Sequence, residues 1–275
     1  MKIESHTLND LHAYRYVPDG QDAKYALVIS HGLGGHGGIY GPFCEHHGGK
    51  GVEIWSYDAP GHGRSNNSRP RGQWTMDEWA QATRDFAAHV KAKTGLPVFA
   101  LGSSLGVGAA ISAIDSPDIS GVIAMGSIAV PGSPLIKSMT EHWRSEAVQQ
   151  VLAQLGRAAR LDIPMFFNFD VDYGFQGAAD AKKLDPLNTW SYDLASWASI
   201  MNYDPPEPLS ENTKPVLFTA GTDDPNIPDG ALEMIVAEVG GPVTLKMFED
   251  AGHQLMLFHT EEYSSCVHEF CLDNA

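Results

Sequence analysis

Cysteine is scarce in this sequence. The 275 residues include three cysteines, Cys44, Cys266 and Cys271, so at least one thiol must stay unpaired. Cys266 and Cys271 lie five residues apart on an expected helix, a spacing that does not indicate a disulfide framework. We therefore expect reduced, buried thiols and a cytoplasmic protein.

Basic residues and long apolar runs are also few. The chain has 18 Lys and Arg against 34 Asp and Glu, a formal net charge of −16. This charge disfavours nucleic acids and anionic membrane surfaces as partners. No apolar run approaches the roughly 20 residues that span a bilayer, and Met1–His6 does not resemble the start of a signal peptide. The expected partner is a small molecule, with no integral membrane association; a homo-oligomer stays open.

Short apolar runs alternate with amphipathic segments over most of the chain. Residues 75–94 show the clearest helical spacing and begin with a capping box formed by Thr75 and Glu78. This alternation predicts an α/β fold, with right-handed crossovers and a mostly parallel sheet flanked by helices. The expected strands are residues 2–8, 11–17, 25–30, 52–58, 97–101, 121–129, 215–220 and 243–248.

The alternation stops near residue 131 and resumes near residue 214. We expect residues 1–130 and 214–275 to form one core, with 131–213 inserted as a helical lid. The aromatic side chains of the insert either line an apolar substrate cleft or pack the insert onto the core. Four are candidate substrate contacts: Trp143, Phe167, Trp190 and Trp197.

The motif Gly102-Ser103-Ser104-Leu105-Gly106 lies between an expected strand and an expected helix. The chain must reverse there within about four residues, and glycines two before and two after Ser104 permit the sharp turn. A serine at such a turn is accessible to a base, and the helix N-terminus offers the Leu105 N–H to an oxyanion. The pattern indicates a nucleophilic serine at position 104.

A nucleophilic serine needs a histidine and an orienting carboxylate. His253 follows the last expected strand, and Asp223 and Asp224 follow the strand before it. The carboxyl ends of parallel strands share one edge, so these side chains are expected near Ser104. Only one of the two adjacent aspartates can face His253, and Asp250 is a third candidate that we interpret as a local turn residue.

A glycine-rich bend, His31–Gly35, follows the strand at residues 25–30. Such a bend can bring the Leu33 N–H to the same oxyanion as Leu105, or it can be an ordinary strand-to-helix turn. Asp58 and His62 precede the serine in a turn rich in glycine and proline, so we assign them a structural role.

These motifs resemble the α/β-hydrolase superfamily, and most closely its monoacylglycerol lipase and lysophospholipase-like esterase branch. The resemblance covers nearly all of the chain outside the insert. It implies a triad of Ser104, Asp224 and His253, with oxyanion contacts from Leu33 and Leu105. The implied reaction is ester hydrolysis of a small acyl ester without a cofactor. The residues that carry the resemblance are His31–Gly35 with Tyr40, Tyr57–Ser65, Gly102–Gly106, Gly221–Pro228 and Ala251–His253.

Three alternatives remain at this level. The same scaffold also hosts lactone, thioester, amide and C–C bond hydrolysis, and cofactor-free lyase or oxygenase reactions. A binding protein that kept the fold is a second alternative, which the intact Ser, His and Asp disfavour. A metal site would need the histidines His31, His36, His46 and His47, whose spacing matches no known ligand set. We therefore expect no metal.

Overall fold

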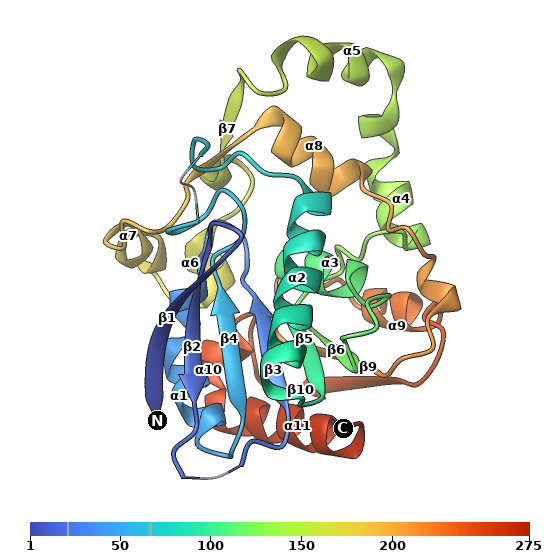
Figure 1. Ribbon diagram of the computed structural model, residues 1–275. Coiled ribbons are helices and arrows are strands. Elements are labelled where there is room, and N and C mark those ends of the chain that lie inside the picture. The colour runs from blue at the N-terminus through green and yellow to red at the C-terminus, as the bar shows by residue number, and fades with distance from the viewer. Residues whose placement is uncertain (21, 66–67) are drawn as a thin grey trace.

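The computed structural model describes residues 1–20, 22–65 and 68–275. Within these ranges one large sheet of eight strands forms the centre of the molecule (Figure 1). In spatial order the strands are β1 (Lys2–Leu8), β2 (Leu11–Val17), β4 (Glu53–Tyr57), β3 (Ala26–Ser30), β5 (Val98–Ser103), β6 (Gly121–Met125), β9 (Val216–Gly221) and β10 (Val243–Phe248).

The sheet is mostly parallel, as the sequence predicted. All neighbours from β4 to β10 pair in parallel, whereas β1 pairs antiparallel with β2 and β2 pairs antiparallel with β4. The carboxyl ends of the parallel strands therefore meet at one edge, where ligands of open α/β sheets bind. The observed strand order and pairing confirm the expected fold class.

Helices cover both faces of the sheet because the strands are apolar on both sides. In β3, Ala26 and Val28 pack into one core cluster, while Leu27 and Ile29 pack into the other. The first cluster includes residues of α2 (Met76–Thr94), α3 (Gly106–Ser112) and α9 (Ala231–Val236). The second cluster includes residues of α1 (Gly41–Gly48), α10 (Leu255–Phe258) and α11 (Thr260–Asp273).

None of the helices in the described ranges combines the length and apolar character that crossing a membrane requires.

Helix α2 begins where the sequence predicts. The Thr75 hydroxyl accepts a hydrogen bond from the Glu78 N–H at 3.2 Å, and the Glu78 carboxylate accepts one from the Thr75 N–H at 2.9 Å. Gly95, with φ of 70°, ends the helix in the left-handed conformation that glycine adopts readily. These local signals explain why the predicted boundaries of this helix match the structure.

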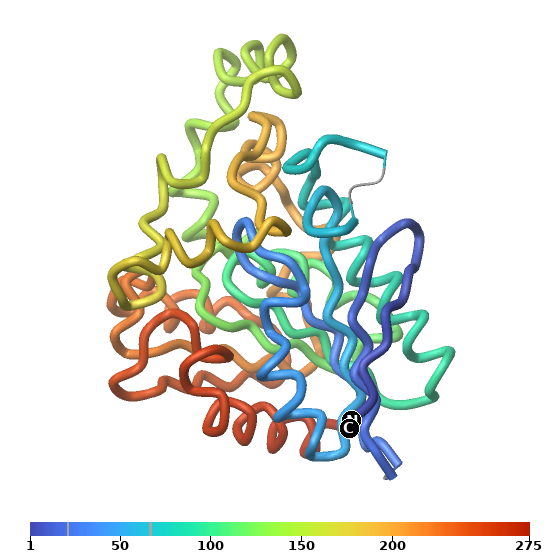
Figure 2. Tube along the Cα trace, turned by 90° about the vertical axis from the view of Figure 1, so that its left-hand side faces the viewer, coloured from blue at the N-terminus to red at the C-terminus, as the bar shows by residue number. Residues whose placement is uncertain are grey.

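The chain between β6 and β9 forms a separate group of short elements beyond the carboxyl ends of the strands, in the upper part of Figure 1. Figure 2 shows the same group above the sheet, with both chain termini at the opposite end. The group includes a strand pair that the sequence analysis did not predict. Its elements are α4 (Pro134–Thr140), η2 (Glu141–Arg144), α5 (Glu146–Leu155), β7 (Arg160–Asp162), η3 (Ile163–Met165), α6 (Phe169–Tyr173), α7 (Ala178–Lys183), β8 (Ser191–Asp193) and α8 (Leu194–Asn202), followed by η4 (Leu209–Glu211).

Candidate active site

Ser104 lies in the sharp turn between β5 and α3. Its φ of 51° is in the left-handed region, which is uncommon for a residue with a side chain. A Cβ on Gly102 would come within 2.5 Å of the Cα of Val107, and one on Gly106 would collide with the carbonyl oxygens of Ser30 and His31. The two glycines therefore permit the close approach of strand and helix that holds Ser104 at the tip.

The neighbouring Ser103 is fully buried, and its hydroxyl is already engaged. The Tyr40 hydroxyl donates to Ser103 Oγ at 2.8 Å and accepts a hydrogen bond from the Gly32 N–H at 3.2 Å. Ser103 thus helps to hold the loop after β3, whereas the half-exposed Ser104 lines a cavity. Of the two serines, only Ser104 is placed to meet a substrate.

His253 and Asp224 form a buried pair on the same edge of the sheet. The Nδ1 of His253 lies 2.8 Å from Oδ2 of Asp224, and the Asp224 side chain is fully buried. Oδ1 of Asp224 accepts a hydrogen bond from the Asn226 N–H at 2.9 Å, which fixes the carboxylate. Asp223 and Asp250 are both exposed, and Asp250 has φ of 53° in a turn. Of the three candidate aspartates, Asp224 is the one that contacts the histidine.

Two carboxylates act on the His253 ring. Burial by itself lowers the pKa of His253, but the hydrogen bond that the ring donates to Asp224 and the charges of Asp172 and Asp224 outweigh burial and raise the pKa above the usual 6.5. Asp172, on α6, places Oδ1 3.5 Å from the histidine Nε2. Ser104 and His253 line one cavity, and within the described residues Nε2 has no hydrogen-bond partner.

Leu33 and Leu105, whose backbone N–H groups are the predicted oxyanion donors, also line this cavity. Among the described residues, neither N–H has a backbone acceptor. The loop that carries Leu33 is fixed from the insert: the Gly34 N–H donates to the Tyr192 hydroxyl at 2.8 Å, and the Gly34 carbonyl accepts from the Thr189 N–H at 2.8 Å. Donors held rigidly beside a serine can stabilise a developing oxyanion.

The cavity has a volume of about 390 Å³ and two unlike walls. One wall comes from α4, η2 and α8 and is mainly apolar, with Thr140 and His142 as its polar members. The other comes from α6 and α7 with the loops after β9 and β10, and it carries polar and charged groups. The apolar wall includes Ile136, Met139, Trp143, Trp197, Ile200 and Met201, and the polar wall includes Asp172, Lys182, Asn226 and Gln254.

Three of the four predicted substrate contacts line the cavity, namely Trp143, Phe167 and Trp197. Trp190 is not among the lining residues. Its ring packs edge to face on Phe169, with 5.5 Å between the ring centroids, and supports the cavity from behind. Some aromatic side chains of the insert therefore line the cavity and others pack behind it. The spacing of these residues in the sequence could not distinguish the two roles.

Asp58 and His62 occupy structural positions, in line with the role assigned from sequence. The Asp58 carboxylate accepts hydrogen bonds from the backbone N–H groups of Gly37 at 2.7 Å and Arg64 at 2.8 Å. Burial lowers the pKa of His62 to about 3, so its ring is neutral and bridges the Pro60 carbonyl and the Tyr192 hydroxyl. Neither residue lines the cavity.

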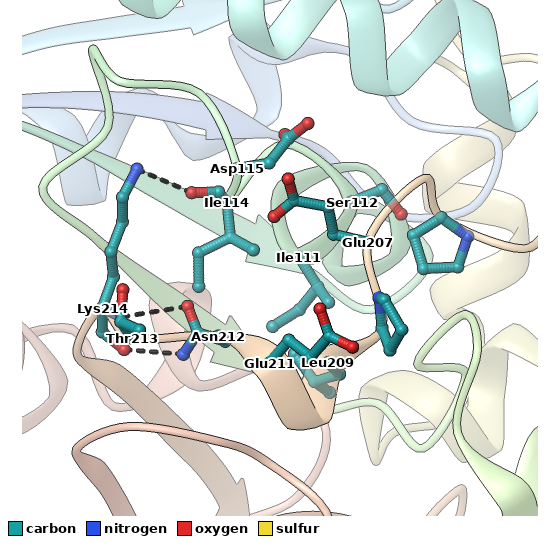
Figure 3. A pocket seen from close by; sticks show the side chains of 12 residues that line it. Ile111, Ser112, Ile114, Asp115, Glu207, Leu209, Glu211, Asn212, Thr213 and Lys214 are labelled. Carbon is teal, nitrogen blue, oxygen red and sulfur yellow. Dashed lines mark hydrogen bonds between the residues drawn. The ribbon is translucent and has the colours of Figure 1, made fainter.

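A second hollow lies at the foot of α3 and contains none of the predicted site residues (Figure 3). Its volume is about 120 Å³. Lys214 crosses its edge and donates to the Ile114 carbonyl at 2.8 Å, and Asn212 bonds to the Lys214 backbone beside it. These contacts hold the chain before β9 against the turn that follows α3. In the described ranges, His, Cys, Asp and Glu side chains do not gather in groups of three or more that could hold a metal ion.

Sequence analysis missed the polar wall. Asn226 lies inside the quoted Gly221–Pro228 segment and Gln254 directly follows His253, so adjacency to a catalytic candidate was an available signal. Asp172 and Lys182 lie in the insert, whose sequence shows no regular hydrophobic periodicity. Without that periodicity, a charged residue that lines a cavity cannot be distinguished from one exposed to solvent.

Comparison with known proteins places the chain in a family. The sequence model of a hydrolase family, described as serine aminopeptidase, S33, matches residues 21–261 of the chain. The chain belongs to this family. A solved structure of monoacylglycerol lipase from Paleococcus ferrophilus superposes on this S33-family chain with a TM-score of 0.73 at 20% identity, covering 96% of this chain and 99% of that one. At this identity the likeness shows the shared α/β-hydrolase fold.

Two curated relatives carry lipase names. A monoglyceride lipase homolog of monkeypox virus is 36% identical over 101 residues, which is 35% of this chain and 35% of that protein. A putative monoglyceride lipase of Schizosaccharomyces pombe is 25% identical over 227 residues, 76% of this chain and 57% of that protein. The matched regions thus span about a third and somewhat more than half of these relatives.

Proposed function

We propose that this S33-family protein is a serine hydrolase that cleaves carboxylic esters of the monoacylglycerol or lysophospholipid type. The observation that carries the proposal is the buried pair of Asp224 and His253, 2.8 Å apart, on the cavity that also holds Ser104 in its left-handed turn. The lipase names of the relatives and the largely apolar cavity support an acyl ester as substrate.

The reaction proceeds in two steps through an acyl-enzyme. Ser104 Oγ attacks the ester carbonyl carbon as its proton passes to Nε2 of His253, while Asp224 stabilises the imidazolium. The oxyanion accepts hydrogen bonds from the Leu33 and Leu105 N–H groups. The tetrahedral intermediate collapses, and His253 returns the proton to the leaving alcohol. Water activated by His253 then releases the acid, and no step requires a metal or a cofactor.

In this proposal each wall of the cavity binds a different part of the substrate. The acyl chain lies along the apolar wall, where Trp143 and Trp197 exclude water, and the alcohol leaves beside the polar wall. Phe167, in the segment before α6, adds a further apolar contact. Residues 131–213 act as the lid that supplies the apolar wall and, through α6 and α7, part of the polar wall. The cytoplasmic location also stays a prediction, which rests on the three free cysteines.

The decisive test is the Ser104→Ala variant. Hydrolysis of medium-chain monoacylglycerols and p-nitrophenyl esters should fall by about 10⁴-fold or more, with the fold intact by circular dichroism. A fluorophosphonate probe should label the wild type and the Ser103→Ala variant but not Ser104→Ala. Labelling or full activity in Ser104→Ala would refute the assignment.

A substrate panel distinguishes the alternative chemistries. Lactones, thioesters and aminoacyl amides should be compared with the esters, because the family description is that of a peptidase and the scaffold hosts several reactions. Labelling of Ser104 combined with failure to cleave any short or medium acyl ester would favour one of those other reactions.

A further inference from the structure

His253 contacts carboxylates at both ring nitrogens. Asp224 lies 2.8 Å from Nδ1, as expected for an orienting acid. Asp172 Oδ1 lies 3.5 Å from Nε2, the nitrogen that must exchange the proton with Ser104 and the leaving alcohol. Asp172 belongs to α6 of the insert, so its approach to the histidine joins two parts of the chain that are far apart in sequence.

The Asp172 carboxylate is held in place by the two loops that carry the catalytic pair. Oδ1 accepts a hydrogen bond from the Asn226 side-chain amide at 2.7 Å, and Oδ2 accepts one from the Gln254 amide at 3.0 Å. Asn226 follows Asp224 by two residues, and Gln254 is the next residue after His253. Both donors are neutral, and among the described residues the ionisable partner closest to this carboxylate is His253 itself. The site therefore holds the Asp172 carboxylate beside the reactive nitrogen.

We propose that Asp172 is a positioning residue of the catalytic centre, which stabilises the protonated form of His253 from the insert and so sets the pH at which the histidine becomes available as a base. This inference rests on the proposed role of His253. It adds a group that the Ser–His–Asp triad does not include. It also makes the strength of the base depend on where α6 lies.

The charged groups around His253 come from three elements. Asp224 follows β9, and Asp172 is on α6. Lys182, on α7, acts on Asp172 rather than directly on the ring. The end of β6 packs against the ring with Gly126, which is uncharged. Two carboxylates act directly on the ring, whereas the one lysine nearby acts only through Asp172. The balance favours the imidazolium, in agreement with the raised pKa of His253.

The sign of the pH effect follows from the mechanism. Protonated His253 cannot accept the proton of Ser104, so the acid limb of kcat/KM reports the pKa of this ring in the free enzyme. A carboxylate at Nε2 moves that limb to higher pH. The same charge stabilises the imidazolium that forms in the transition state, so its removal should also lower the plateau of kcat.

The test compares Asp172→Asn with the wild type over pH 4.5 to 9. The acid limb of kcat/KM should move to lower pH by about one unit or more, the size expected for loss of an opposite charge within about 4–6 Å. The plateau should fall. Asp180→Asn is the matched control, because it removes one charge from the exposed face of α7 and should leave the limb in place.

A second variant separates charge from anchoring. Asn226→Ala removes one hydrogen bond to Asp172 but keeps the carboxylate. If Asp172 only anchors α6, both variants should lower stability or raise KM alike and neither should move the limb, which would overturn the proposal. The proposal requires that Asp172→Asn move the limb and that Asn226→Ala leave it within about 0.3 units of the wild type.

Direct titration of His253 by NMR in the Ser104→Ala background gives a readout independent of turnover. The ring should titrate at lower pH when Asp172→Asn is added. An unchanged titration would refute the inference and leave the proposed hydrolase intact. Full activity of Ser104→Ala would refute the hydrolase, while the titration would still report the coupling between Asp172 and His253.

Discussion

The sheet edge and the insert both line the cavity, but different forces hold them in place. At the sheet edge, Ser104 and His253 follow paired strands, and glycines such as Gly106 sit where a Cβ would meet backbone atoms. In the insert, helices of five to ten residues contribute side chains that are held by hydrogen bonds and ring contacts. In the proposed mechanism, the reactive side chains thus lie on the sheet edge and most of the substrate-contacting side chains lie on the insert.

The sheet and the insert also differ in how much of their apolar surface is exposed to solvent. Most of the exposed large apolar side chains of the described chain lie in the insert, although it makes up less than a third of the residues. A segment with much apolar surface in water gains less stability from packing than the core does. Substitutions that crowd the sheet edge should therefore cost stability and catalysis together, whereas substitutions in the apolar wall that the insert supplies should mainly change selectivity. The exposed residues of the insert are Met139, Val151, Leu155, Met165, Phe166, Phe167, Val171, Phe175 and Leu184.

The largest effect within this comparison should come from Gly106→Ala. The added methyl would collide with the carbonyl oxygens of Ser30 and His31, which are backbone atoms that cannot rotate away. We expect a loss of about 2–4 kcal/mol in unfolding free energy by urea titration, together with a large loss of activity. Gly41→Ala, where a Cβ would meet its nearest atom at 3.6 Å, is the control and should be close to neutral. Equal behaviour of the two variants would contradict a rigid sheet edge.

An intermediate effect is expected at Lys182 on the polar wall. This lysine is 9% exposed, donates to the Asn188 side-chain oxygen at 3.2 Å, and forms no ion pair with a described residue. Burial lowers its pKa to about 8, against the opposing pull of Asp172 and Asp185. Charging it in the folded protein is therefore costly at neutral pH, and Lys182→Met should raise the unfolding free energy by about 1–3 kcal/mol at pH 7.

The pH dependence of this gain has a definite sign. Between the folded pKa of about 8 and the unfolded value near 10.5, the unfolded chain binds more protons, so the wild type becomes more stable as pH rises. The advantage of Lys182→Met should therefore be complete below pH 8 and smaller at pH 9.5, by urea unfolding at both. Lys183→Met, whose side chain is 59% exposed, should change stability by less than about 0.5 kcal/mol. If the stability advantage of Lys182→Met over the wild type did not decrease at pH 9.5, burial of the charged lysine could not be its cause.

The smallest effect is a change of selectivity from the apolar wall. Ile200→Trp on α8 should fill part of the cavity, so kcat/KM for a twelve-carbon ester should fall by about 10-fold relative to a four-carbon ester. Met234→Trp, on the exposed surface of α9, should leave this ratio unchanged. Equal losses for both esters would mean that the acyl chain does not lie along α8.

Local pattern was sufficient to predict much of the fold. The strands at residues 2–8, 11–17 and 243–248 match β1, β2 and β10, because turn residues and apolar runs mark their ends. Residues 121–129 were assigned to one strand, but β6 ends at Met125 because Gly126, with φ of 67°, turns the chain towards the insert. The placement of Ser104 and His253 also followed from the sequence, since each comes directly after a strand of a parallel sheet.

The sequence by itself determined the strands of the central sheet, the serine turn and the position of the histidine after the last strand, because each depends on a few consecutive residues. The family resemblance had pointed to Asp224 rather than Asp223, and the structure places the Asp224 carboxylate against His253. Only the tertiary structure decided that Trp190 lies behind the cavity and that Asp172 approaches the far side of the His253 ring. These outcomes depend on contacts between residues 21 to 81 positions apart in the sequence. Short-range propensity carries no information about such distances, because they are set by how complete elements pack together.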